Sequence, residues 1–262
     1  KLLYLVTEDW YFWSHRLPLA RAARDRGYDV VIATRVDECR ERIESEGFRL
    51  IDIRLRRRSR NPVQEILAIA ELVGIYRRER PDLVHHVAVK PVLYGSLAAR
   101  WTGVPRVLNA LAGMGYLFTS SHRRARLLQS MLEPAFKAAL AMPGSRVILQ
   151  NPDDARLLVE RELIRREQVA LIRGSGVDTR HFSPRPEQEG SPLVVLASRM
   201  LWDKGIKEFV EAARILREEG TAARFALVGD GDPDNPASIP ASTMKDWDRR
   251  GDVEWWGFRG DM

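Results

Sequence analysis

Short apolar runs alternate with helical stretches along nearly the whole chain, and this alternation constrains the fold more than any other feature. The runs are four to seven residues long, and apolar residues recur at helical spacing between them. Strands joined by helices predict a parallel sheet with both faces covered, because each parallel connection crosses over the sheet. The first part of the chain has predicted strands at 2–7, 28–34, 48–53, 82–87, 106–111, 146–149 and 168–172, and predicted helices at 14–26, 37–46, 62–78, 91–101, 123–141 and 152–163.

Residues 174–191 are rich in glycine, serine, proline and charged residues, a composition that predicts a linker. The alternation then restarts. A parallel sheet of three strands would leave a bare edge and a thin core, so we expect a truncation inside a second domain. The second part has predicted strands at 193–197, 224–228 and 253–256, and predicted helices at 204–219 and within 236–249.

The fold class that follows is α/β, with two Rossmann-like domains facing a cleft. The first domain is predicted at 1–173, the linker at 174–191 and the N-terminal part of the second domain at 192–262. Ligands of open parallel sheets bind at the carboxyl ends of the strands, so we expect the ligand between the domains.

One strand-to-helix turn has the residues of a diphosphate site. Residues 194–198 resemble a buried strand, and Arg199 and Lys204 follow it before a predicted helix. Such a turn presents backbone N–H groups and the positive end of the helix dipole. A planar guanidinium and an ammonium add charges that suit a diphosphate. Solvated surface charge is the alternative interpretation, and we predict a nucleotide-diphosphate pocket.

Composition limits the classes of protein that remain. No apolar run is long enough to span a bilayer, and the N-terminus does not resemble a signal peptide. The single cysteine, Cys39, excludes an internal disulfide and a cysteine zinc cluster. We therefore expect a cytoplasmic protein.

The net charge of +6 is concentrated in two basic runs. Solvated loop surface is one interpretation, and attraction to anionic lipid headgroups or a lipid-linked phosphate is the second. Nucleic acid is disfavoured as a partner, because no aromatic residues interleave with the arginines. We expect peripheral association with the inner face of the cell membrane. The runs consist of Arg54, Arg56, Arg57, Arg58 and Arg60, and of His122, Arg123, Arg124 and Arg126.

Five stretches of the chain carry a resemblance to a known family. They are 8–18, 85–91, 113–118, 174–178 with Phe182 and Pro184, and 194–205 followed by 227–231. Together they resemble glycosyltransferase family 4, the retaining glycosyltransferases of GT-B fold, over essentially the whole chain. The 8–18 stretch is similar to a narrower bacterial subgroup. Its members transfer a sugar from a UDP-sugar to undecaprenyl-diphosphate-linked saccharides.

The resemblance implies a donor site in the second domain. Arg199 and Lys204 match the pair that holds the donor diphosphate, where they would neutralise charge on the departing nucleotide. We therefore expect no metal and no other cofactor. Gly229 and Gly231 would let the backbone approach the nucleotide, or they simply form a tight turn at a strand end.

The resemblance also implies an acceptor site in the first domain, and we assign five residues to it. Glu8 and Asp9 would orient the acceptor hydroxyl as a general base, unless the departing phosphate takes that proton. His15 would contact the acceptor phosphate or sugar, or pack at the start of a helix. Of the two adjacent histidines that end a predicted strand, we assign His86 to the cleft. Lys90, at a predicted helix start, would bind the acceptor phosphate.

The chain departs from the family pattern at three places. Many members have a glycine pair where Glu8 and Asp9 stand, and many have a histidine where Ala112 stands. The Glu-x7-Glu motif that grips the donor sugar would lie after Met262. These departures leave a hexosyl- or N-acetylhexosaminyltransferase of bacterial surface glycan synthesis as the expected function. The alternatives are a sugar-nucleotide epimerase of the same fold and a non-catalytic membrane-docking module.

Overall fold

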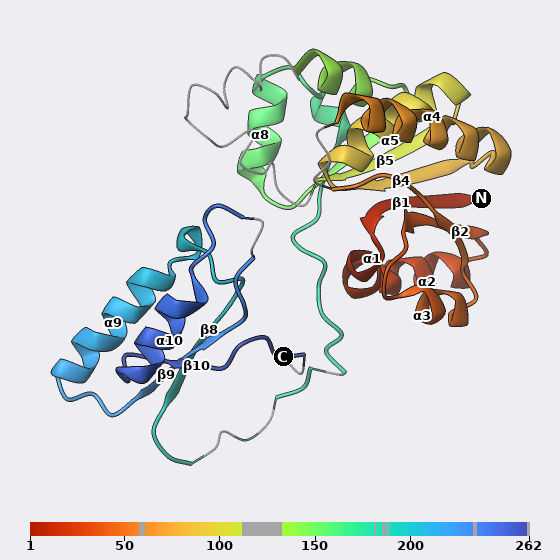
Figure 1. Ribbon diagram of the computed structural model, residues 1–262. Coiled ribbons are helices and arrows are strands. Elements are labelled where there is room, and N and C mark those ends of the chain that lie inside the picture. Colours follow the sequence, from red (N-terminus) through yellow and green to blue (C-terminus); the bar gives the residue numbers. More distant parts are fainter. Residues whose placement is uncertain are drawn as a thin grey trace. The chain divides into compact units, whose positions relative to one another are not determined.

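The computed structural model describes residues 1–57, 61–111, 133–180, 182–184, 186, 189–232 and 235–260. The chain divides into two compact units, Lys1–His181 and Phe182–Met262, which Figure 1 shows. The division falls inside the segment that was predicted as a linker. None of the described helices is both long enough and apolar enough to cross a membrane.

A sheet of seven parallel strands forms the first unit. The strand order is β3-β2-β1-β4-β5-β6-β7. The order reverses between β1 and β4, which are neighbours although two strands separate them in the sequence. A reversal of this kind leaves a crevice at the carboxyl ends of the two strands, where α/β proteins bind ligands. All seven predicted strands form, as β1 (Leu2–Glu8), β2 (Val30–Arg35), β3 (Arg49–Asp52), β4 (Leu83–Val87), β5 (Arg106–Leu111), β6 (Ser145–Leu149) and β7 (Val169–Leu171).

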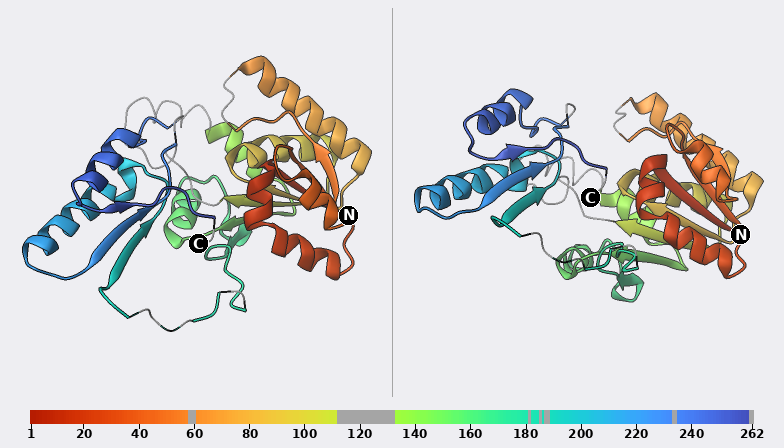
Figure 2. Two further views of the ribbon diagram at one scale, coloured as in Figure 1. Left: turned by 60° about the horizontal axis from the view of Figure 1, so that its bottom comes forward. Right: turned by 90° about the horizontal axis from the view of Figure 1, so that it is seen from below.

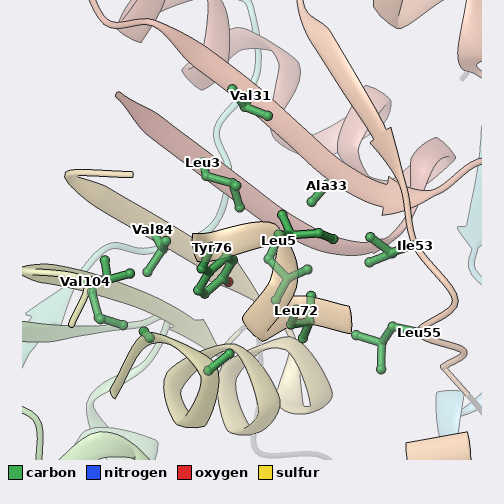
Figure 3. Packing of buried hydrophobic residues seen from close by; sticks show 14 of the residues in the cluster. Leu3, Leu5, Val31, Ala33, Ile53, Leu55, Leu72, Tyr76, Val84 and Val104 are labelled. Carbon is green, nitrogen blue, oxygen red and sulfur yellow. The ribbon is translucent and has the colours of Figure 1, made fainter. Parts of the chain in front are cut away.

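Both faces of this sheet are buried, which explains why its strands are apolar throughout. Alternate residues of a strand point to opposite faces. Leu3 and Leu5 pack toward α4 (Pro62–Glu79) and α5 (Val89–Thr102), in the cluster that Figure 3 shows around Leu72 and Tyr76. Tyr4 belongs to the cluster on the other face, with α1 (Asp9–His15), α2 (Leu17–Asp25) and α3 (Arg40–Ser45). The helix at 133–140 and α8 (Pro152–Glu160) cover the far end of the sheet.

The helix predicted at 14–26 is two helices in the structure. The first, α1, begins directly after β1, so residues 10–13 are helical rather than a loop, and Phe12 is fully buried. Arg16 ends α1 with a non-helical backbone, and Pro18 then lies in the first turn of α2. Proline suits that position because it lacks an N–H that would otherwise be unpaired. The break places Arg16 at a corner between the two helices.

The second unit contains three parallel strands in the order β10-β9-β8. They are β8 (Leu193–Ala197), β9 (Arg224–Val228) and β10 (Glu254–Trp255), as predicted. The helices α9 (Ile206–Glu218) and α10 (Ala241–Arg249) share one buried cluster with Phe225 and Leu227, and Figure 2 shows both beside the sheet.

The expectation that 194–198 is a buried strand is wrong. Val194 and Val195 are 42% and 41% exposed. The reason is the position of β8, which is an edge strand whose neighbour in the described sheet is β9. A sequence that is apolar at every position therefore does not distinguish a buried strand from an edge strand.

Candidate functional site

The predicted donor residues lie in two loops that leave the same edge of the second sheet. Ala197 at the end of β8 pairs in register with Val228 at the end of β9. The backbone N–H of Met200 donates to the carbonyl of Asp230 at 2.9 Å, which ties the two loops together. Because the strands are parallel, both loops emerge at the carboxyl edge, the position at which such sheets bind nucleotides.

Arg199 and Lys204 come from the first of these loops. The Arg199 guanidinium donates to Oδ2 of Asp232 in the second loop at 3.1 Å, and the Arg199 side chain is 52% exposed. Lys204 is exposed at the end of a 3-10 turn, η2 (Trp202–Lys204). The predicted helix start at Lys204 is therefore two residues early, because Gly205 adopts a left-handed conformation before α9 begins. Both side chains remain accessible, and Lys204 lies two residues before the N-terminus of α9, as a diphosphate site requires.

Packing within the protein explains the two glycines of the second loop. A Cβ at Gly229 would lie 1.9 Å from the carbonyl oxygen of Ser198, and the residue has a φ of +131°. A Cβ at Gly231 would lie 2.8 Å from Oγ of Ser238. Only glycine allows such close approach of neighbouring chain segments. Contact with a nucleotide is not needed to account for either residue and stays a prediction.

Glu8 and Asp9 lie at the carboxyl end of β1, but their carboxylates are engaged inside the first unit. Glu8 forms an ion pair with Arg35 at 2.8 Å. Asp9 is fully buried, and its Oδ2 accepts hydrogen bonds from the N–H groups of Asp37 and Cys39 at 2.7 and 2.8 Å. In this arrangement Asp9 holds the segment between β2 and α3 and has no exposed oxygen for an acceptor hydroxyl.

The structure places His86 in the core and not at a cleft. Its Nε2 is 2.9 Å from the hydroxyl of Tyr76 and its Nδ1 is 2.8 Å from Oδ1 of Asn109. Burial lowers the pKa of His86 to about 4, although the bond to Asn109 favours the charged form. The assignment of His86 to the acceptor is therefore wrong, because its ring faces α4 and α5 while the preceding residue, His85, faces the opposite side of the sheet.

The side chain of Lys90 is also paired with groups of the protein itself. Its Nζ donates to both carboxylate oxygens of Glu65, at 2.9 and 3.0 Å, and to the carbonyl of Arg56 at 3.0 Å. The predicted helix at 91–101 begins earlier, at Val89, which places Lys90 in the first turn of α5, where it pairs with α4. This ion pair does not favour the predicted contact with an acceptor phosphate.

A pocket of about 160 Å³ lies in the first unit at the carboxyl ends of its central strands. Among the predicted acceptor residues, His15 lines it. The ring of His15 stacks on Tyr11 with centroids 4.3 Å apart, and burial, followed by the charge of Arg16, lowers the pKa of His15. The lining residues are His15, Arg16, Pro18, Leu19, His85, Ala110, Leu111, Ile148, Gln150, Ile172, Gly174 and Ser175.

Three polar residues of this pocket were missed in the sequence, namely Arg16, His85 and Gln150. Arg16 directly follows the predicted His15. Side chains alternate between the two faces of the sheet along β4, so His85 could have been assigned to the face that α1 and α2 cover if the strand register had been known. The register is visible in the structure, where His85 is the partner of Tyr4 on β1. Within the described part of the chain, no three potential metal-ligating side chains form a cluster.

Several predictions fall outside the described residues. They concern the 113–118 stretch with Ala112, the second basic run, most of the helix predicted at 123–141, and Arg58 and Arg60 of the first basic run. The described helices α3, α8 and α10 lie within the ranges predicted for them, with shorter ends.

Comparison with known proteins identifies the class of protein that shares this two-unit α/β architecture. A structure of Anabaena HepE in complex with UDP and glucose superimposes with a TM-score of 0.71 at 16% identity, over 99% of this chain and 70% of that one. The sequence profile described as glycosyl transferase 4-like matches residues 1–151, more than half of the chain. The chain belongs to this glycosyltransferase family.

Two curated relatives define the similarity further. One is the N,N'-diacetylbacillosaminyl-diphospho-undecaprenol alpha-1,3-N-acetylgalactosaminyltransferase of Campylobacter jejuni, 25% identical over 95% of this chain and 67% of the relative. The other is the UDP-Gal:alpha-D-GlcNAc-diphosphoundecaprenol alpha-1,3-galactosyltransferase of Escherichia coli, 24% identical over 65% of this chain and 46% of the relative. The chain thus spans two thirds of one relative and less than half of the other.

Proposed function

We propose that the protein transfers a hexose or N-acetylhexosamine from a UDP-sugar to an undecaprenyl-diphosphate-linked saccharide, with retention at the anomeric carbon. The observation that carries the proposal is the similarity, along 95% of the chain, to a relative whose name describes transfer to a diphospho-undecaprenol-linked sugar. The accessible Arg199 and Lys204 at the carboxyl edge of the second sheet supply the charges that a donor diphosphate needs.

In the proposed reaction, the acceptor hydroxyl oxygen forms a bond to the anomeric carbon while the bond from that carbon to the diphosphate oxygen breaks. The hydroxyl proton passes to the departing diphosphate. Negative charge grows on that diphosphate as the bond breaks. Arg199 and Lys204 stabilise this charge, which is the electrostatic role that a metal ion plays in other transferases.

We also propose that the first unit docks on an anionic membrane, where a lipid-linked acceptor would lie. Val63, Ile66 and Leu67 occupy one face of the first two turns of α4 and are 64%, 66% and 55% exposed. Arg56 and Arg57, also exposed, precede the helix. Exposed apolar residues flanked by arginines are typical of helices that lie in the headgroup region of a bilayer.

An assay of the full-length protein with a panel of UDP-sugars, with and without an undecaprenyl-diphosphate-linked saccharide, tests this function. The proposal predicts that UDP is released and a longer lipid-linked saccharide forms only when donor and acceptor are both present. Conversion of a UDP-sugar to its epimer without an acceptor would identify an epimerase instead. Membrane binding with no turnover of any donor would identify a docking module.

A further inference from the structure

The pocket in the first unit lies at the point where the strand order of the sheet reverses. Its walls come from the α1–α2 corner that follows β1, from β4, and from the segments that end β5 and β6. Together with the segment that follows β7, five separate chain segments thus meet around about 160 Å³, which is room for one phosphoryl group or one sugar ring. Open α/β sheets bind their ligands at this position.

Two polar atoms of the pocket walls are buried without a partner. Within the described part of the chain, neither Nε2 of His85 nor Nε of Arg16 has a hydrogen-bond partner, and His85 is only 1% exposed. A buried polar atom that makes no hydrogen bond destabilises the fold, because it has lost its hydrogen bonds to water without replacement. Two such atoms in the walls of one pocket indicate that a bound ligand supplies their missing hydrogen bonds.

The charged and polar side chains of the pocket walls indicate the class of ligand that the pocket binds. Its walls carry the Arg16 guanidinium, two histidines, the Gln150 amide and the Ser175 hydroxyl, and no carboxylate is among the described lining residues. Burial, followed by the charge of Arg16, lowers the pKa of His85 to about 3, so that its ring is neutral at physiological pH. A partly buried cation that has no carboxylate among the described lining residues favours an anion.

We propose that this pocket is a phosphoryl-binding site, in which Arg16 and His85 donate hydrogen bonds to phosphoryl oxygens. A phosphoryl group presents oxygens in several directions and so matches donors that come from four chain segments, whereas a carboxylate presents two oxygens in one plane. A neutral sugar would leave the guanidinium without a counter-charge. The residues of this pocket belong to the first unit, whereas Arg199 and Lys204 of the predicted donor site belong to the second.

The test is a titration of the histidine-labelled full-length protein with inorganic phosphate, at constant ionic strength, followed by the imidazole nitrogen resonances. The protein carries Arg199→Gln and Lys204→Gln, so that the donor loop does not contribute. The proposal predicts a saturable shift of the His85 Nε2 resonance and a Kd at least tenfold weaker in Arg16→Gln.

Arg26→Gln is the matched control, because it removes the same charge from the other end of α2, where Arg26 is exposed. It is expected to leave the Kd unchanged. Gln150→Leu provides a second pocket variant if Arg16→Gln does not fold. No shift of His85 with phosphate, an equal Kd in Arg16→Gln and the parent, or a larger shift with methyl glucoside than with phosphate would overturn the proposal.

A kinetic arm identifies the source of the phosphoryl group, and this arm alone rests on the proposed function. If the group belongs to the lipid-linked acceptor, Arg16→Gln in the protein that keeps Arg199 and Lys204 raises KM for the acceptor at least fivefold and leaves KM for the UDP-sugar unchanged. If both constants stay unchanged while phosphate binding is lost, the ligand is free phosphate. Absence of transfer by the protein that keeps Arg199 and Lys204 would contradict the proposed function and leave the result of the phosphate titration intact.

Discussion

The guanidinium of Arg199 and the carboxylate of Asp232 lie 3.1 Å apart and join the loops that follow β8 and β9. The pair fixes the direction of a cation that is otherwise half exposed. It also places a negative charge beside the proposed diphosphate site. Asp232 therefore orients Arg199 at the cost of some repulsion toward an anionic ligand.

Asp232→Asn is expected to tighten UDP binding about two- to fivefold, a modest gain because solvent screens charges at this exposed edge. The amide oxygen can still accept from Arg199, so the guanidinium keeps its orientation. Isothermal titration calorimetry with UDP measures the change. Weaker binding in this variant would show that the negative charge of Asp232 assists the site instead of repelling the ligand.

Asp9→Ala is expected to lower the free energy of unfolding by about 2–4 kcal/mol, because it leaves the buried N–H group of Cys39 and the partly buried N–H group of Asp37 without acceptors. Urea unfolding measures this loss, and Asp25→Ala on the exposed surface of α2 is the control. If Asp9 were instead a general base, Asp9→Ala would keep normal stability and lose transfer.

The stability of the first unit is expected to fall as the pH drops from about 6.5 toward 4. His86 has an ordinary pKa of 6.5 and a pKa of about 4 in the fold, so the unfolded chain binds the extra proton first. This difference corresponds to about 3 kcal/mol, fully present above pH 6.5 and lost as the pH falls through 4. His86→Gln should have a shallower dependence of the urea midpoint on pH. An unchanged dependence would mean that His86 is charged in the folded protein.

Replacing Val63, Ile66 and Leu67 together by serine is expected to reduce co-sedimentation with anionic vesicles roughly tenfold, because it removes the apolar face of α4. Arg56→Gln with Arg57→Gln should reduce binding mainly at low salt, since salt screens the attraction to lipid headgroups. Trp101→Ser, which removes an exposed aromatic residue from α5, is the control. Equal binding by the serine variant and the parent would contradict the docking proposal.

The sequence was sufficient to predict the fold, because hydrophobic periodicity locates strands and helices without knowledge of their neighbours. All strands of both described sheets lie where the apolar runs predicted them. The break at Arg16 was missed, since one helix was predicted from residue 14 through Pro18 to residue 26, whereas Pro18 lies in the first turn of a second helix.

The candidate site was predicted less well, because the function of a polar side chain depends on which face of its element it occupies. His85 and His86 are adjacent in the sequence, and both are buried. Because α4 and α5 pack against one face of the sheet, His86 lies in the core, whereas His85 faces the other side and lines the pocket. Likewise, the pairing of Lys90 with Glu65 joins residues that are 25 positions apart. Neither relation can be read from local spacing.

The most direct test of the proposed function is the rate of sugar transfer by Arg199→Ala and Lys204→Ala in the full-length protein, with Lys207→Ala on the exposed first turn of α9 as the control. Loss of one electrostatic contact to a departing group typically costs a factor of about 100 to 1000 in kcat. We predict a loss of this size in each of the first two variants, unchanged folding, and normal transfer by Lys207→Ala. Transfer within about threefold of the parent in both Arg199→Ala and Lys204→Ala, a difference of less than 1 kcal/mol, would contradict the proposed function.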